Sequence, residues 1–375
     1  MTDDLDFRSV ATHCLNAFLI SFVLSLAMGN LATRFGLVDV PTGRKKHDAP
    51  VPLVGLAIFL AFAVSSLLIG QHLPGILGLL AGLAMIVLIG IVDDRMDLRA
   101  SHKLLAQVII VFVIALSNGP LIANIGNLNH GQPLLLGGWS IPVTIFAVVG
   151  IINAMNMIDG LDGLAGGISL ASLLWFAAAA LLLGQTADLL LILVLACCIL
   201  GFLVLNMRHP WRRRAAVFLG DGGSMMLGLG LAFVAITLSQ HPKSALSPVA
   251  VLWICGLPII DTLSLIVRRF AAGQNPMSSD RQHLHYLLLD SGFSVTETVT
   301  LLIGINIVLG AVGVLGSHLR VPDSILLFGL MAPISLHAWF TSFGGKHQAG
   351  SVQFFDGGLA SRRIHIGLSV RRHQR

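Results

Sequence analysis

The sequence predicts an all-α, polytopic integral membrane protein with about eleven transmembrane helices. Three observations lead to this fold class. Hydrophobic residues make up 55% of the 375 residues and charged residues only 11%, less than half the charged share of a typical soluble domain. Apolar runs long enough to cross a bilayer recur along most of the chain. The basic residues are sorted to alternate loops between these runs.

Each predicted span is an apolar run close to the roughly 17–25 residues that a helix needs to cross the hydrocarbon core. In chain order the runs cover 12–33, 51–70, 74–92, 104–118, 139–156, 164–183, 187–206, 222–239, 248–268, 297–316 and 324–341, of which the fourth is short. A single multi-span catalytic domain is therefore expected over 1–343. The glycine-rich, basic segment 344–375 is predicted to be a flexible cytoplasmic tail.

The Lys and Arg residues orient the predicted helices. One set of segments (34–47, 95–103, 208–214, 268–281 and the tail) carries twenty of the twenty-three Lys and Arg residues. The opposite loops carry only Lys243 and Arg320, and the N-terminal segment only Arg8. By the positive-inside rule the N-terminus is periplasmic and the C-terminus cytoplasmic. The net charge of +5 is thus an orientation signal that also suits anionic membrane lipids, and no nucleic-acid partner is predicted.

Acidic residues cluster in three of the predicted cytoplasmic loops. They are Asp93, Asp94 and Asp97 in the second loop, Asp159 and Asp162 in the third, and Asp221 at the end of the fourth. The outer loops hold only two aspartates. Helix capping explains one or two such residues, but a charge near the membrane interior costs about 2.5–3.5 kcal/mol even on a lenient scale. A shared cation site therefore explains the clustering better than scattered caps.

The spacing within each acidic cluster suits metal and phosphate chemistry. Asp93 and Asp94 are adjacent and point different ways on a helix, so one can face a metal while the other faces a substrate as a general base. Asn153 and Asn156 precede Asp159 and Asp162. The glycines around these two aspartates allow a tight turn in which backbone amides can approach a phosphate closely. Oxygen ligands of this kind select Mg²⁺, or Mn²⁺, over zinc.

Two basic loops supply candidate phosphate ligands. Lys46 and His47 precede the second span, and Arg281, His283 and His285 lie in the fifth cytoplasmic loop. Histidines two residues apart do not share a helix face, so a zinc pair is not predicted, and hydrogen bonding to phosphate is favoured.

Asp261 lies within the ninth predicted span, about two turns from its cytoplasmic end. It is expected either to pair with Arg268 or Arg269 or to act directly. The histidines within or outside the spans, His318 and His337 among them, are given no role.

Five segments follow one another in a recognisable order: RKKH with VPLVG, DDRMDL, NAMNMIDGLDGLAGG, VFLGDGGS and DRQHLH. In this order they resemble the polyprenyl-phosphate N-acetylhexosamine-1-phosphate transferases. Within this family the resemblance is strongest to the WecA-like undecaprenyl-phosphate N-acetylglucosamine-1-phosphate transferases, relatives of MraY. It covers roughly residues 30 to 295 and all five predicted cytoplasmic loops, and leaves the tail unexplained.

The resemblance implies a Mg²⁺-dependent transfer of N-acetylglucosamine 1-phosphate from UDP-N-acetylglucosamine to undecaprenyl phosphate, with release of UMP. It implies the cytoplasmic face of the bacterial inner membrane and the first membrane step of O-antigen or another envelope polysaccharide. A second copy of the chain is a candidate partner. Direct attack by the lipid phosphate and an aspartyl-phosphate intermediate both stay open.

The resemblance also assigns roles to residues. The implied catalytic residues are Asp93, Asp94, Asp159 and Asp162. The implied metal ligands are Asp221 and Asp94. The implied substrate-binding residues are Lys46, His47, Asn156, Asn206, Phe218, Arg281, His283 and His285, with Phe218 at the position that stacks on uracil in the family.

The chain departs from the family pattern at Tyr286, where a further histidine is usual, so a different UDP-N-acetylhexosamine donor is the alternative. Two other classes are weaker. A cation-coupled transporter would place its acids at the membrane midplane on broken helices, which the sequence does not indicate. An intramembrane aspartyl protease would need a Gly-x-Gly-Asp setting, and Phe218-Leu219-Gly220-Asp221 lacks the first glycine.

Overall fold

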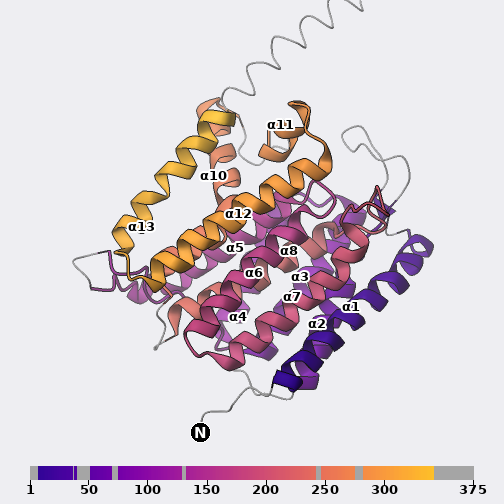
Figure 1. The fold of residues 1–375 in the computed structure, drawn as a ribbon, viewed down its shortest axis with the longest axis horizontal. Helices are drawn as coiled ribbons and strands as arrows, with labels where there is room; N and C mark the ends of the chain where they lie inside the picture. The colour runs from indigo at the N-terminus through magenta and orange to yellow at the C-terminus, as the bar shows by residue number, and fades with distance from the viewer. Residues whose placement is uncertain are drawn as a thin grey trace, which may run out of the picture.

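The protein is a bundle of apolar α-helices packed side by side (Figure 1). The computed structural model describes residues 7–36, 38–39, 51–69, 75–128, 132–241, 246–274 and 282–341. The predicted ligands Lys46, His47 and Arg281 and the predicted tail lie outside these residues.

Almost all the secondary structure described is helical, which confirms the predicted all-α class. The elements are α1 (Phe7–Arg34), β1 (Val38–Asp39), β2 (Val51–Pro52), α2 (Gly55–Ile69), α3 (Ile76–Met96), α4 (Ala100–Leu116), the 3-10 turn η1 (Gly137–Trp139), α5 (Ser140–Ile158), α6 (Leu164–Leu182), α7 (Thr186–Asn206), α8 (Gly220–Gln240), α9 (Pro248–Ile254), α10 (Gly256–Ala271), α11 (Leu284–Asp290), α12 (Val295–His318) and α13 (Asp323–Gly329). The strands β1 and β2 form one short antiparallel pair.

Each of the eleven predicted spans coincides with a helix or a helix pair. Within the described residues, eight helical segments are long and apolar enough to cross a membrane, the last of them running from Asp323 to Thr341. The helices α2 and α4 are apolar but shorter, with 15 and 17 residues. The chain is therefore a multi-pass membrane protein.

The prediction of one continuous helix over 248–268 for the ninth span is wrong. The helices α9 and α10 meet at Cys255 with a bend of 82°. Pro258 lies in the first turn of α10. It has no amide hydrogen to donate, and its ring would clash with the carbonyl of Ile254, four residues earlier. The proline therefore accounts for the break, and a hydropathy pattern alone does not register it.

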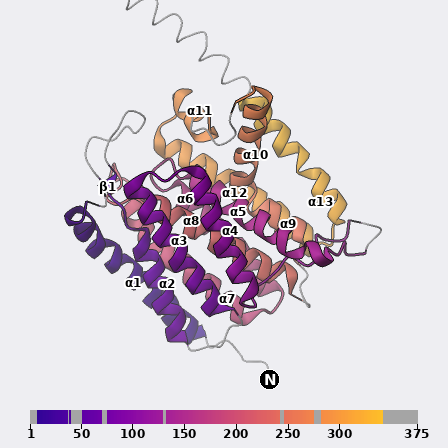
Figure 2. The same cartoon turned by 180° about the vertical axis from the view of Figure 1, so that it is seen from behind.

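The helix α8 forms the centre of the bundle. Of the residues in its apolar window 89% are buried, against 17% in α1 and 22% in the segment that begins with α13. The two outer helices lie at opposite edges of the molecule in both views (Figures 1 and 2). Their exposed apolar side chains match a surface that faces lipid.

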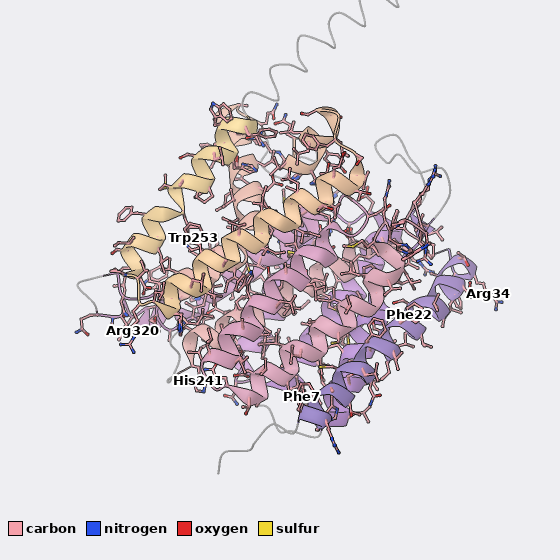
Figure 3. The ribbon with its side chains drawn as sticks, in the orientation of Figure 1. Phe7, Phe22, Arg34, His241, Trp253 and Arg320 are labelled. Carbon is pink, nitrogen blue, oxygen red and sulfur yellow. The ribbon has the colours of Figure 1, made fainter. Side chains whose placement is uncertain are left out.

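A pair of glycines sets the contact between α3 and α8. A Cβ atom on Gly90 would overlap the backbone of Gly222, so the two helices touch without intervening side chains. Asp94 lies one turn beyond Gly90, and Asp221 directly precedes Gly222. Close packing of the helices thus brings these two acidic residues together at one end of the bundle. This is the Arg34 end of α1 in Figure 3, away from Phe7 and His241.

Candidate active site

The five loops predicted to be cytoplasmic meet at this end of the bundle. Four contacts connect them: Leu53 with Phe218, Lys103 with Asp221, Asn156 with Asp221, and Gly160 with His285. Because every loop touches another, the residues predicted from separate motifs belong to one continuous region. The loops are far apart in sequence, and only the helix packing unites them.

Three carboxylates and one ammonium group form an acidic cluster, defined here as Asp93, Asp94, Lys103 and Asp221. Lys103 Nζ lies 2.6 Å from Asp93 Oδ2 and 3.5 Å from Asp221 Oδ2. The side chains of Asp93 and Asp221 also lie within hydrogen-bonding reach of each other. Carboxylates this close repel unless a proton or cation lies between them. Lys103, which the sequence marked only as a loop cation, supplies part of that positive charge.

The adjacent aspartates Asp93 and Asp94 have different surroundings. The Asp93 side chain is 2% exposed and accepts hydrogen bonds from Lys103 and from the amide of Leu98, at 2.9 Å. Asp94 is exposed, and its Oδ1 accepts the backbone N–H of Asp221 at 3.1 Å. Both aspartates contact Asp221, Asp93 through the side chain of Asp221 and Asp94 through its backbone N–H, so the predicted division of the pair between a metal and a substrate stays a prediction. Asp93 is held inside the cluster, whereas Asp94 can reach a ligand.

An amide network on α5 orients Asp221 from the other side. Asn156 Nδ2 donates to Asp221 Oδ1 at 3.0 Å and to Ser224 Oγ at 2.9 Å. One turn earlier Asn153 Nδ2 donates to Gln107 Oε1 at 2.6 Å. Asp221 is thus fixed from α4 and α5 while 37% of its side chain stays exposed.

The donor atoms of the acidic cluster suit a hard cation. They are carboxylate oxygens with an amide group beside them, and no thiol or imidazole takes part. Among the described residues no group of three His, Cys, Asp or Glu side chains is arranged to hold a metal ion by itself. This pattern fits Mg²⁺, which commonly uses one or two carboxylates and completes its shell with water and phosphate oxygens.

The third loop lies beside the acidic cluster rather than in it. Asp162 Oδ2 accepts from Arg208 Nε at 2.7 Å and from the amide of Ala215 at 3.2 Å. Asp159 is half-buried at the end of α5. Asp162 therefore ties the third loop to the fourth, and its predicted catalytic role stays a prediction.

Two predicted nucleotide contacts lie in the fourth loop. The Asn206 side chain is buried, accepting from the amide of Gly163 at 2.9 Å and donating to the carbonyl of Val217 at 2.8 Å. Any ligand of Asn206 must compete with these two bonds. Phe218 is half-buried, and its backbone bonds to Pro52 and Val54 on either side of the bridge to Leu53.

A second cluster of polar side chains, the histidine cluster, is defined by Asp261, His283, His285 and His337. Asp261 Oδ2 lies 2.8 Å from His283 Nδ1, and Oδ1 lies 3.0 Å from both His337 Nε2 and the amide of Leu284. The arginine partners predicted for Asp261 are wrong, because two histidines occupy its oxygens. His337, given no role, is one of them.

His285 links this cluster to the third loop. Its ring stacks on His283 at a centroid distance of 5.5 Å and contacts Tyr286 at 4.2 Å. A Cβ atom on Gly160 would collide with His285 Nε2. Gly160 is therefore the residue that lets the imidazole approach the backbone between Asp159 and Asp162. The signal that could have identified His337 is its place inside an apolar run, where a histidine needs a buried partner.

Comparison with known proteins gives one family. The model of glycosyl transferase family 4 matches residues 76–239. An undecaprenyl-phosphate alpha-N-acetylglucosaminyl 1-phosphate transferase of Yersinia pestis is 31% identical over 86% of this chain and 89% of its own length. The protein of the same name from Escherichia coli K12 is 30% identical over 89% of this chain and 92% of its own. A probable undecaprenyl-phosphate N-acetylglucosaminyl 1-phosphate transferase of Bacillus subtilis is 34% identical over 74% of this chain and 78% of its own.

Proposed function

The chain belongs to glycosyl transferase family 4, together with these undecaprenyl-phosphate N-acetylglucosaminyl 1-phosphate transferases, and on this premise we propose its reaction. It transfers N-acetylglucosamine 1-phosphate from UDP-N-acetylglucosamine to undecaprenyl phosphate and releases UMP. The product is the first lipid-linked sugar of O-antigen or another envelope polysaccharide. A different UDP-N-acetylhexosamine is the alternative donor, because Tyr286 replaces a usual histidine.

The observation that carries this proposal is the acidic cluster at the meeting point of five loops. Both substrates are anionic, so their phosphates repel each other as they approach. A site for their reaction therefore needs a positive charge that offsets this repulsion, and carboxylates can hold such a charge in place. The site must also lie at a helix end that both a lipid and a soluble nucleotide can reach. Lys103 lies between Asp93 and Asp221 and supplies one such charge.

A divalent cation would supply the rest. Asp221 and Asp94 would hold Mg²⁺, with Mn²⁺ as a substitute, and the amide of Asn156 keeps Asp221 oriented toward it. When bound, such an ion neutralises the charge that develops on the leaving phosphate.

The two adjacent aspartates have separate tasks in this proposal. Exposed Asp94 takes the proton of the lipid phosphate, whose oxygen attacks the β-phosphorus of the sugar nucleotide while UMP departs. Buried Asp93 holds Lys103 in place. Lys46, His47, Arg281, His283 and His285 bind phosphate or sugar oxygens, Phe218 stacks on uracil, and Asp159 and Asp162 shape the cleft beside them.

The membrane setting follows from charge sorting. The active end faces the cytoplasm, where UDP-sugars are made, and the membrane is the bacterial inner membrane. The N-terminus is then periplasmic. A second copy of the chain stays a predicted partner.

The test is UMP release by detergent-purified protein given undecaprenyl phosphate, Mg²⁺ and each of several UDP-sugars in turn. The proposal predicts release with UDP-N-acetylglucosamine that requires the lipid and stops when EDTA removes the metal. Release with another UDP-N-acetylhexosamine alone would replace the donor. Absence of release with every sugar, from a folded and monodisperse sample, would overturn the reaction class.

A further inference from the structure

A tight turn in the fourth loop, named the tryptophan turn and defined as residues 209–212, projects an indole from the protein. The amide of His209 donates to the carbonyl of Arg212 at 3.0 Å, and the amide of Arg212 donates back at 2.8 Å. Pro210 takes the first central position, where its fixed φ favours a turn. Trp211 takes the second, and 92% of its surface is exposed, the highest value among the large hydrophobic residues described. The backbone therefore holds outward an indole that the fold does not bury.

The tryptophan turn lies at the edge of the lipid-facing surface. It begins three residues after the end of α7, and Arg212 Nη1 donates to the carbonyl of Val204 in the last turn of that helix at 3.1 Å. Val204 and Leu200, one turn apart on α7, are 40% and 44% exposed, so this side of the helix faces lipid. The turn thus folds back onto the end of a membrane-spanning helix, beside its lipid-facing side. This is the level at which hydrocarbon gives way to lipid headgroups.

The residues next to the indole are basic. Arg213 and Arg214 are exposed and follow Arg212 directly, and no acidic residue lies between Arg208 and Asp221 in the sequence. Tryptophan is favoured where the membrane meets water, and basic segments beside a span attract anionic lipids. Guanidinium groups also form paired hydrogen bonds with phosphate oxygens. An indole and arginines at one turn therefore match the two parts of an anionic phospholipid, the base of its acyl chains and its phosphate.

We propose that the tryptophan turn anchors the fourth loop to anionic phospholipids at this face of the membrane. The indole of Trp211 lies at the level of the headgroups, and Arg213 binds their phosphates. The inference rests on the multi-pass fold and goes beyond the proposed reaction, because the contact lies outside both the acidic cluster and the histidine cluster.

The anchor acts on the fourth loop as a whole. Arg208 Nε, just before the turn, and the amide of Ala215, shortly after it, both donate to Asp162 Oδ2, at 2.7 and 3.2 Å. The turn is thus tied to the third loop from both sides, and the same loop continues to Phe218. A lipid contact at the turn therefore restrains the loop beside the cleft without touching either substrate.

The first test measures where the indole lies. Wild type and Trp211→Phe are placed in nanodiscs of phosphatidylcholine with or without phosphatidylglycerol, and the difference between their emission spectra isolates Trp211. With phosphatidylglycerol present, lipids brominated near the glycerol should reduce this emission about twofold, because the indole lies at the interface. Aqueous acrylamide should have little effect. Strong quenching by acrylamide in both membranes, with none by the brominated lipids, would show an indole in water and overturn the proposal.

Trp139 is the matched control for this measurement. It is also exposed, at 71%, but it lies in η1 at the opposite end of α5 from the acidic cluster. No Lys or Arg lies between Lys103 and Arg208 in the sequence. The emission isolated with Trp139→Phe should therefore be quenched equally in the two kinds of nanodisc. A Trp211 signal that is as insensitive to phosphatidylglycerol as that of Trp139 would contradict the choice of anionic lipid.

The second test reverses one charge and keeps the indole. Arg213→Glu should lower the quenching of Trp211 by brominated lipid about twofold in nanodiscs with phosphatidylglycerol and leave it unchanged in phosphatidylcholine alone. The control is Arg320→Glu, at the opposite end of the bundle (Figure 3), which should change neither value. An equal response to phosphatidylglycerol in wild type and Arg213→Glu would overturn the proposal. Neither test needs turnover, so an inactive enzyme would contradict the proposed function and leave this inference to be decided by the quenching.

Discussion

The acidic cluster and the histidine cluster both contain aspartates near one end of the bundle, yet they are built in opposite ways. In the acidic cluster Asp93 and Asp221 lie against each other, and 37% of the Asp221 side chain and 23% of that of Lys103 are exposed. In the histidine cluster Asp261 is 2% exposed, and both its oxygens accept hydrogen bonds. The acidic cluster therefore has negative charge that a bound cation can neutralise. In the histidine cluster every oxygen of the aspartate already has a partner, and the hydrogen bond to Asp261 fixes the orientation of the His283 imidazole.

Removing one charge from the incomplete cluster should have the largest effect. We expect Asp221→Asn to reduce UMP release by about 10³-fold or more, the scale seen when a group that stabilises developing charge is lost. Asp94→Asn should be similarly inactive. The measurement is steady-state UMP release, with thermal unfolding to show that the variants fold. Asp188→Asn, at the start of α7, is the matched control and should retain activity. Near-normal rates of UMP release in the Asp221 and Asp94 variants would contradict the assignment of the acidic cluster as the active site.

Lys103 distinguishes an electrostatic role from simple packing. Lys103→Met keeps the length of the side chain but leaves Asp93 and Asp221 without its ammonium group. We expect about a 10²-fold loss of kcat, because the repulsion in the cluster rises while its shape is kept. The variant Asp93→Asn should lower activity through the same contact. Their double variant should therefore lose much less than the product of the two single effects. Multiplicative losses would mean that the ion pair at 2.6 Å does not couple the residues functionally.

Asp261 should behave as a positioning residue. Asp261→Asn keeps the shape of the side chain. It replaces one of the two carboxylate oxygens that face His283 and His337 with an NH₂ group, which donates instead of accepting. Loss of a carboxylate that orients a functional imidazole typically costs about 10–100-fold, so we expect a loss of activity in that range, smaller than for Asp221→Asn. The loss should divide between kcat and the KM for the sugar nucleotide and leave the KM for the lipid unchanged. Asp290→Asn, exposed at the end of α11, is the control. A loss confined to thermal stability would assign Asp261 a structural role only.

His337 should show the smallest effect. His337→Phe removes one hydrogen bond from Asp261 and leaves those from His283 and Leu284 in place. We expect a loss of UMP release below about tenfold, together with a lower unfolding temperature, since a buried acceptor loses a partner. His318→Phe, at the end of α12, should change neither quantity. An effect on turnover as large as that of Asp261→Asn would mean that His337 takes part in more than positioning.

The sequence predicted the fold class and the span order well, because apolar length is the dominant signal for a helix in lipid. It also predicted that the acids of three loops lie at one end of the bundle, whereas Asp93 and Asp94, which were expected to point different ways, both contact Asp221. The bend between α9 and α10 was missed, since Pro258 interrupts hydrogen bonding without changing hydropathy.

The partners of Asp261 could not be predicted for a different reason. His337 is separated from Asp261 by 76 residues and belongs to no motif. Its contact exists only because the helical segment from Asp323 to Thr341 lies beside α10. Lys103 was likewise counted only among the basic residues that orient the helices. Its position in the same loop as Asp93, Asp94 and Asp97 could have indicated that it pairs with them. Long-range polar pairs of this kind depend on packing geometry, which periodicity and composition do not encode.

The most direct test of the central claim follows the β-phosphate. Purified protein is given undecaprenyl phosphate, Mg²⁺ and UDP-N-acetylglucosamine labelled with ³²P in the β-phosphate, and the organic and aqueous phases are separated. The proposed reaction moves the sugar together with its 1-phosphate, so the label should enter the lipid phase in step with the release of unlabelled UMP. Label that stays in the aqueous phase as UDP while sugar reaches the lipid would contradict the account, as would the absence of any transfer.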